Sequence, residues 1–243
     1  MGLILCLETA TEVCSVALAL NGNIVKIKES SSPNEHSSLL TVFIEEIIAS
    51  GGYALSNLDA VAVSMGPGSY TGIRIGVATA KGLCYSLEKP LIAISTLQSM
   101  ALGMKNHASA GRETQTGLSE PPPIGFFCPL IDARRMEVYT AVYDTKMNPV
   151  KEAAAEIIQD TSFDDFLIHR RMVFAGSGAE KCKPLLEHRK NAFFIDNFTA
   201  SAKFMAALAE DKWNRDQFEN IAYFEPFYLK DFIAGKPRVK GLV

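Results

Sequence analysis

Residues 66–76 read Gly66-Pro67-Gly68-Ser69-Tyr70-Thr71-Gly72-Ile73-Arg74-Ile75-Gly76 and follow a near-continuous apolar run, 58–65. Such a run is typical of a strand buried on both faces, which occurs in sheets that helices cover on both sides. A glycine-rich turn that opens a helix exposes backbone N–H groups to which an anion can bind. The glycine spacing matches neither a P-loop nor a Rossmann fingerprint. The stretch therefore predicts an α/β fold, with a helix over 71–86.

The helix after this turn has one smooth face, because Gly72, Gly76 and Ala80 recur every four residues. An interior glycine costs a helix about 1 kcal/mol relative to alanine, so these glycines need a reason. Close packing or a partner interface is favoured over phosphate binding. A preceding helix, predicted over 36–49, is apolar around most of its circumference, which is typical of a helix buried on two sides. The candidate interface residues on the two helices are His36, Leu39, Leu40, Phe43, Ile47, Gly72, Ile73, Gly76, Val77 and Ala80.

The two halves of the chain repeat one pattern. Each begins with a strand that ends in a carboxylate (Glu8, Asp132), and each later has a buried strand, a Gly-x-Gly turn and a helix. A duplicated β-β-β-α-β-α unit predicts two mixed sheets that face each other across a cleft. We expect an N-terminal subdomain over 1–104 and a C-terminal subdomain over 105–213, with 214–243 returning to the first. The further predicted strands are 3–7, 13–20, 24–29, 91–94, 125–131, 136–143, 172–175 and 193–196; further helices begin at 96, near 164, after 178 and at 201.

The cleft between the halves is a candidate nucleotide site. In two-domain folds that close on ATP, strand-end acids hold the metal–phosphate group, and the glycine turn at 176–178 would lie under the adenine. The competing interpretation is that strand-end carboxylates cap turns. The candidate nucleotide- or anion-binding residues are Glu8, Thr9, Gly66, Gly68, Ser69, Asp132, Gly176 and Gly178.

Composition excludes several classes of protein. The 243 residues carry a net charge of −3, which disfavours a protein that grips nucleic acid alone. Only the last fourteen residues are basic, with Lys230, Lys236, Arg238 and Lys240 against Asp231, a net charge of +3. No apolar run approaches the roughly 18 residues of a membrane span, and the N-terminus has no basic or cleavable leader. Five cysteines without a Cys-x-x-Cys pair indicate reduced core thiols. We therefore expect a cytoplasmic protein that does not bind membranes.

Taken together, the motifs resemble the TsaB family (formerly YeaZ), which bacteria require to make threonylcarbamoyladenosine in tRNA. The segments that carry the resemblance are 3–11, 66–76, Asp132-Ala133-Arg134-Arg135 with Glu137-Val138-Tyr139, and Pro226-Phe227-Tyr228-Leu229-Lys230. The resemblance implies an actin/hexokinase/Hsp70-like (ribonuclease-H-like) fold and a non-catalytic paralogue of TsaD, the transferase subunit. In TsaD two histidines four residues apart hold the metal; here His36 matches the first and Leu40 replaces the second, so we expect no metal site.

The resemblance also implies partners. Family members pair with TsaD, or with themselves as a homodimer, through the first two helices; the ATPase TsaE joins that pair, and tRNA is reached through the complex. The implied role is a scaffolding subunit, not an enzyme, with no cofactor of its own; whether ATP or ADP binds at the complex interface stays open. Two alternatives remain: an ATP-dependent small-molecule kinase of the same superfold, indicated by Glu8 and Asp132, and a metalloprotease, which the sequence supports least. Many relatives have Asp-Thr-Ser where this chain has Glu8-Thr9-Ala10.

Overall fold

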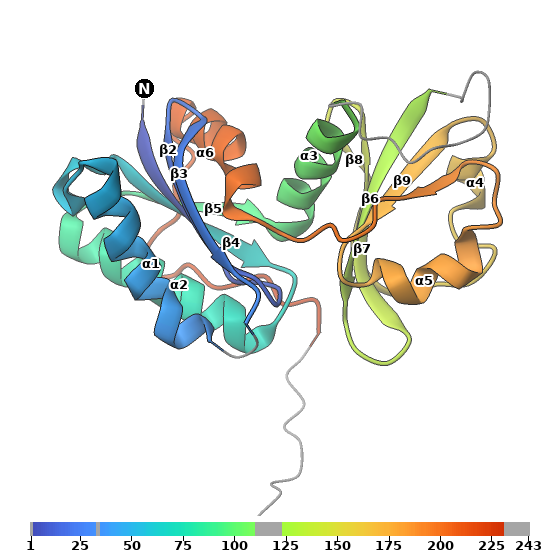
Figure 1. Ribbon diagram of the computed structural model, residues 1–243, viewed down its shortest axis with the longest axis horizontal. Helices are drawn as coiled ribbons and strands as arrows, with labels where there is room; N and C mark the ends of the chain where they lie inside the picture. Colours follow the sequence, from blue (N-terminus) through green and yellow to red (C-terminus); the bar gives the residue numbers. More distant parts are fainter. Residues whose placement is uncertain (1, 33–34, 110–122, 231–243) are drawn as a thin grey trace, which may run out of the picture.

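The computed structural model describes residues 2–32, 35–109 and 123–230, which form two α/β subdomains side by side (Figure 1). The strand order is β3-β2-β1-β4-β5 in the first sheet and β10-β9-β6-β7-β8 in the second. In each sheet the first strand pairs antiparallel with the second and parallel with the fourth. The predicted duplication into two mixed sheets is confirmed.

The first subdomain contains the glycine-rich turn. Its strands are β1 (Leu3–Glu8), β2 (Cys14–Leu20), β3 (Asn23–Ser30), β4 (Ala60–Gly66) and β5 (Leu91–Ser95). Its helices are α1 (His36–Gly51), the 3-10 turn η1 (Leu55–Asn57) and α2 (Tyr70–Leu87), together with η2 (Ala202–Met205) and α6 (Ala206–Asn214), which return from the end of the chain. Asn21 and Gly22 both have positive φ, as a two-residue hairpin turn between β2 and β3 requires.

Strands β1 and β4 are mostly apolar because helices cover both faces of their sheet (Figure 1). Alternate residues such as Leu5 and Val63 pack under α1 and α2, whereas Ile4 and Ala62 meet η2 and α6 on the opposite face. This two-sided burial explains the near-continuous apolar run at 58–65. The expected boundary at residue 213 placed α6 with the second subdomain; in the structure α6 packs on the first sheet.

The second subdomain is built in the same way. Its strands are β6 (Ile124–Asp132), β7 (Glu137–Asp144), β8 (Pro149–Ile157), β9 (Arg171–Ala175) and β10 (Ala192–Phe194); its helices are α3 (Thr96–Ser109), α4 (Asp164–Leu167) and α5 (Ala179–Leu186). Met100 and Met104 of α3 pack on this sheet, so α3 belongs with it although the expected boundary fell at 104. On the opposite face α4 and α5 contribute Leu167 and Leu186.

The segment after α6 runs back along the first subdomain and reaches the second. Glu219 bridges to Leu91 of β5, and Lys81 of α2 donates to the carbonyl oxygen of Phe224 at 3.1 Å. The N–H of Phe227 donates to Met65 at 2.8 Å, and Lys230 forms an ion pair with Glu137 of β7. Residues 219–230, here called the C-terminal strap, therefore tie the two subdomains together.

The five cysteines are free and buried, which confirms the predicted reduced core thiols. Burial raises the pKa of the Cys6 thiol to about 12 and that of Cys14 to about 11, so neither is a reactive thiolate at neutral pH. Within the described ranges, no helix is long and apolar enough to cross a bilayer.

Candidate functional site

The glycine-rich turn is filled by the chain's own backbone. A Cβ on Gly66 would lie 2.6 Å from the carbonyl oxygen of Phe227 in the C-terminal strap, and one on Gly68 would clash with the carbonyl oxygen of Ala10. The N–H of Ser69 donates to the Ala10 carbonyl at 2.6 Å, and the Ser69 hydroxyl accepts from the N–H of Gly72 at 3.2 Å. The glycines thus permit close backbone packing, and two donors at the start of α2 are already used. The turn is not arranged as an anion cradle.

The smooth face of α2 meets its own sheet. A Cβ on Gly72 would clash with the Thr9 carbonyl oxygen, and one on Gly76 with the Thr9 hydroxyl. That hydroxyl donates to the carbonyl oxygen of Gly72 at 2.8 Å and fixes the contact. Ile73, Val77 and Ala80 are buried in the same core. The close-packing alternative therefore accounts for the spacing, and these five candidate interface residues are not free to meet a partner.

The candidate residues of α1 are also directed inward. Leu40, Phe43 and Ile47 are buried in the first core, and Leu39 packs against it. His36 donates from Nε2 to the carbonyl oxygen of Thr11 at 2.9 Å, which holds the start of α1 to the turn after β1. The candidate interface residues of both helices therefore lie on faces that pack within the chain.

The exposed faces of α1 and α2 carry a different set of residues. Ala78, Gly82 and Tyr85 lie on one face of α2 because they are four and three residues apart. Nothing lies within 4 Å of a Cβ placed on Gly82, and Tyr85 is 82% exposed. Val42 on the neighbouring α1 is 43% exposed. Gly82 is the signal in the sequence that could have identified this face, which we call the outer helix face: Val42, Ala78, Gly82 and Tyr85.

Glu8 is a buried cap and not an open ligand. Its carboxylate accepts from the N–H of Ala10 at 2.6 Å, as a turn-capping acid does, and none of its surface is exposed. Among the described residues its Oε2 has no hydrogen-bond partner. Burial raises the pKa of Glu8 to about 7, against hydrogen bonds to Ala10, Ser64 and Thr9 that lower it. The capping interpretation therefore holds for Glu8 and for the turn that Thr9 begins.

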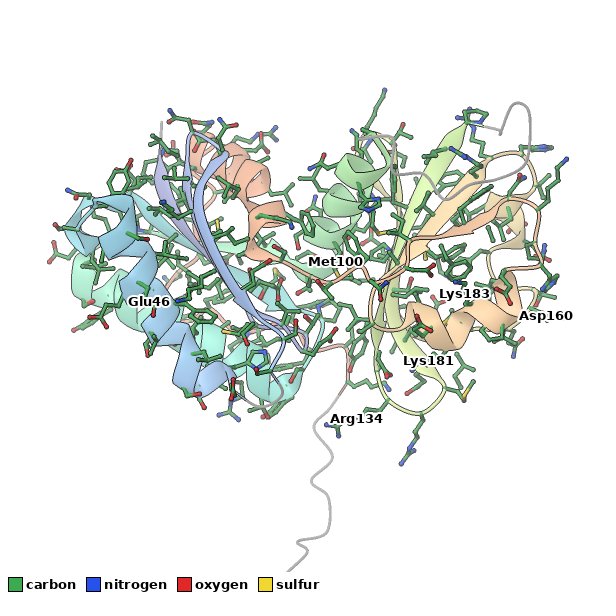
Figure 2. All side chains as sticks on the ribbon, viewed as in Figure 1. Glu46, Met100, Arg134, Asp160, Lys181 and Lys183 are labelled. Carbon is green, nitrogen blue, oxygen red and sulfur yellow. The ribbon has the colours of Figure 1, made fainter. Side chains whose placement is uncertain are left out.

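Asp132 is occupied by a lysine of its own subdomain. Lys181 of α5, labelled in Figure 2, has its Nζ 2.5 Å from Asp132 Oδ1. It also donates to the carbonyl oxygens of Glu137 at 2.6 Å and Arg135 at 3.1 Å. The same carboxylate oxygen accepts from the N–H of Arg134 at 2.7 Å. Asp132 therefore fixes the β6–β7 turn, and its charge is neutralised within the chain.

Gly176 and Gly178 again serve close packing. Gly176 has φ 112°, a left-handed value that favours glycine, and the N–H of Gly178 donates to the carbonyl oxygen of Leu130 at 2.9 Å. Beside this turn lies a cavity of about 160 Å³, at the place where the sequence analysis put the adenine. Its charged lining residues are Glu12 of the first subdomain with Glu180, Lys183 and Asp196 of the second, and Ser177, Asn197 and Thr199 are its uncharged polar ones.

This cavity is small and acidic. Ligand pockets usually measure about 300–1,000 Å³. The single lysine of its lining, Lys183, forms an ion pair with Asp196 at 2.8 Å. A polyphosphate is therefore disfavoured here. In the part of the chain that the structure describes, no group of three His, Cys, Asp or Glu side chains is placed to hold a metal ion.

Comparisons with known proteins match two related kinds of protein named for tRNA threonylcarbamoylation. The family model for TsaD, tRNA N6-adenosine threonylcarbamoyltransferase, matches residues 29–234. The tRNA threonylcarbamoyladenosine biosynthesis protein TsaB of Escherichia coli K12 is 30% identical over 245 residues, which cover 96% of this chain and 96% of that protein. A crystal structure from Pseudomonas aeruginosa, described as similar to peptidase YEAZ, superposes with a TM-score of 0.79 at 26% identity and covers 95% of this chain and all of that one.

The fold extends to more distant proteins. The activator of 2-hydroxyisocaproyl-CoA dehydratase from Clostridium difficile, solved with bound ADPNP, superposes with a TM-score of 0.51 at 11% identity over 90% of this chain and 98% of that one. The two duplicated subdomains thus have the actin/hexokinase-like fold that the family resemblance implied. With a TsaB relative matched over nearly its whole length, the chain belongs to the TsaB family of tRNA threonylcarbamoyladenosine biosynthesis proteins.

Proposed function

We propose that this chain is a non-catalytic subunit that pairs with a TsaD homologue during formation of threonylcarbamoyladenosine in tRNA. In this proposal the transferase chemistry belongs to the partner, and the chain serves as a scaffold that also recruits TsaE. Without the partner, two copies would pair through the same helices. The tRNA is reached within that complex.

The observation that carries the proposal is the outer helix face. Small residues at Ala78 and Gly82 leave room for a second helix to approach closely, and Tyr85 on the same face of α2 supplies exposed aromatic surface. Val42 is an exposed apolar residue on the neighbouring helix α1. Aromatic residues that are exposed in a monomer are enriched in protein interfaces. A solvent-exposed glycine in the middle of a helix costs about 1 kcal/mol, and contact with a partner gives that cost a reason.

The internal use of the two strand-end acids supports a non-catalytic role. Glu8 caps a turn in the interior, and Asp132 is paired with Lys181. A kinase of this superfold would need those carboxylates for its metal–phosphate group. Titration calorimetry with Mg-ATP is expected to detect no binding by the isolated chain at micromolar concentration. Binding with a Kd below about 100 μM (about −5.5 kcal/mol) would instead favour the kinase alternative.

A variant at Gly82 tests the interface. Gly82→Arg should weaken pairing with the TsaD homologue at least about tenfold, a loss of about 1.4 kcal/mol or more, because a long charged side chain would separate the helices. Gly82→Ala is the matched control and should pair nearly as the parent chain does. Pairing is measured by light scattering and titration calorimetry, and circular dichroism checks that both variants fold.

The outcomes distinguish a failure of the proposed pairing from a failure of the proposed interface. If the parent chain forms no complex with its cognate TsaD homologue, the proposed role fails. If the complex forms and Gly82→Arg binds as tightly as the parent, the role stands and the outer helix face is not the interface. Phe43→Asp and Gly76→Arg would not test the interface, because both positions lie in the core and either substitution would unfold the chain itself.

A further inference from the structure

The turn between β6 and β7 holds two arginines in an unfavourable backbone conformation. Arg134 and Arg135 have φ values of 68° and 52°, the left-handed region that Gly and Asn adopt readily and other residues rarely do. Strain of this kind persists where surrounding contacts impose it, and it concentrates at functional positions. Here Lys181 holds the carbonyl oxygens of Arg135 and Glu137 and so imposes the turn.

The same contacts leave the two arginine charges facing solvent. Asp132 is paired with Lys181 and Glu137 with Lys230, so each neighbouring acid already has a cation. Arg134, Arg135 and the following Met136 are exposed. Figure 2 shows Arg134 projecting from the tip of the turn away from both sheets. The turn therefore presents two positively charged side chains to solvent.

Aromatic rings extend this charge across to the first subdomain. Tyr228 of the C-terminal strap contacts Tyr70 of α2, with ring centroids 5.1 Å apart. The Arg74 guanidinium lies over the Tyr70 ring, 5.3 Å from its centroid. Lys230, two residues further on, lies over Tyr139 of β7 at 5.8 Å. We call this line of residues the basic ridge: Tyr70, Arg74, Arg134, Arg135, Tyr228 and Lys230.

The charge of the basic ridge is opposite to that of the whole chain. Counting Lys181, it has five basic side chains against Asp132, Glu137 and Glu225, whereas the chain has a net charge of −3. The sequence that follows Lys230 adds Lys236, Arg238 and Lys240 against Asp231. Cations recognise phosphates, and exposed aromatic rings between them are the pattern on which nucleobases stack. An acidic protein surface would use the charges but would not need the rings.

We propose that the basic ridge binds RNA directly, with Arg134 and Arg135 on backbone phosphates and the Tyr228 ring, 40% exposed, available to a base. The RNA is the tRNA of the complex, so its identity rests on the proposed function. The ridge gives the chain a direct contact with tRNA, beyond a scaffolding role. With so few phosphate contacts and a net negative chain, affinity is low for the isolated chain and adds to that of the partner in the complex.

The test compares two double charge reversals of equal size. R134E/R135E alters the ridge, and K146E/K190E alters exposed lysines away from it; Lys146 lies at the opposite end of β7. Binding of a fluorescein-labelled, unmodified tRNA transcript is followed by anisotropy between about 50 and 200 mM KCl, with the isolated chain and with the heterodimer. R134E/R135E is expected to lower affinity at least about tenfold at low salt and to reduce the salt slope by about 2. K146E/K190E should change affinity less than about twofold.

The other results either overturn the ridge or separate it from the proposed function. Equal losses in both double variants would mean that only bulk charge matters. Unchanged affinity in R134E/R135E, or no tRNA binding by the parent chain either alone or in the heterodimer, would also overturn the proposal. Loss of the heterodimer with unchanged tRNA binding would assign the turn to a protein partner instead. If the parent chain fails to pair but its tRNA binding still depends on Arg134 and Arg135, the proposed function fails and the ridge stands.

Discussion

Replacing Gly72 with alanine is expected to lower the free energy of unfolding by about 3 kcal/mol or more, at the upper end for an overpacked core. The added Cβ would come inside 3.0 Å of the carbonyl oxygen of Thr9, a backbone atom that cannot rotate away. The clash would also separate the Thr9 hydroxyl from the carbonyl oxygen of Gly72, a buried hydrogen bond of 2.8 Å. Urea denaturation followed by circular dichroism measures the loss.

Two other glycines of α2 make a graded control for this prediction. At Gly76 the obstacle is the Thr9 hydroxyl, a side-chain atom, so Gly76→Ala should destabilise the chain less than Gly72→Ala. At Gly82 the space is open, so Gly82→Ala should stabilise the chain by up to about 1 kcal/mol through helix propensity alone. The expected order of stability is Gly82→Ala above the parent, then Gly76→Ala, then Gly72→Ala. Equal effects at the three positions would contradict the packing explanation.

The fold could be predicted because its signals are local. A strand buried on both faces leaves a nearly continuous apolar run, a glycine-rich turn leaves closely spaced glycines, and an amphipathic helix leaves a periodic pattern. The same set in the second half indicated the duplication. Elements whose stability comes from neighbouring strands were harder to predict from the sequence. Strand β8, with the sequence PVKEAAAEI, has few β-branched residues and forms because it pairs with β7 at the edge of its sheet.

The candidate site was harder to predict, because a smooth helix face does not reveal what it packs against. The spacing of Gly72, Gly76 and Ala80 fits a partner and an internal sheet equally well, and only the position of Thr9 decides between them. Asp132 posed the same difficulty: its lysine partner is 49 residues away in the sequence. Packing of α6 on the first sheet likewise depends on a chain reversal that leaves no local pattern.

The stability of the parent chain is expected to fall as pH rises from about 4.5 to about 7, and Glu8→Gln should remove that fall. Burial raises the pKa of Glu8 from 4.5 to about 7, so the folded chain holds this proton more tightly than the unfolded chain does. The stabilisation is therefore fully present below the lower pKa and is lost as pH passes the higher one. A difference of this size corresponds to about 3 kcal/mol.

The pH dependence isolates Glu8 from the other titrating groups of the chain. Denaturation near pH 5 and near pH 8.5 gives the change in unfolding free energy for each variant, and that change should be smaller in Glu8→Gln by about 3 kcal/mol. Ser64→Ala provides a second variant, because the Ser64 hydroxyl bonds to the Glu8 carboxylate and lowers its pKa. Its removal should move the loss of stability to higher pH. Identical pH dependence in the parent and Glu8→Gln would mean that Glu8 does not retain a proton in the folded chain, and a partner for its buried Oε2 would then have to be sought.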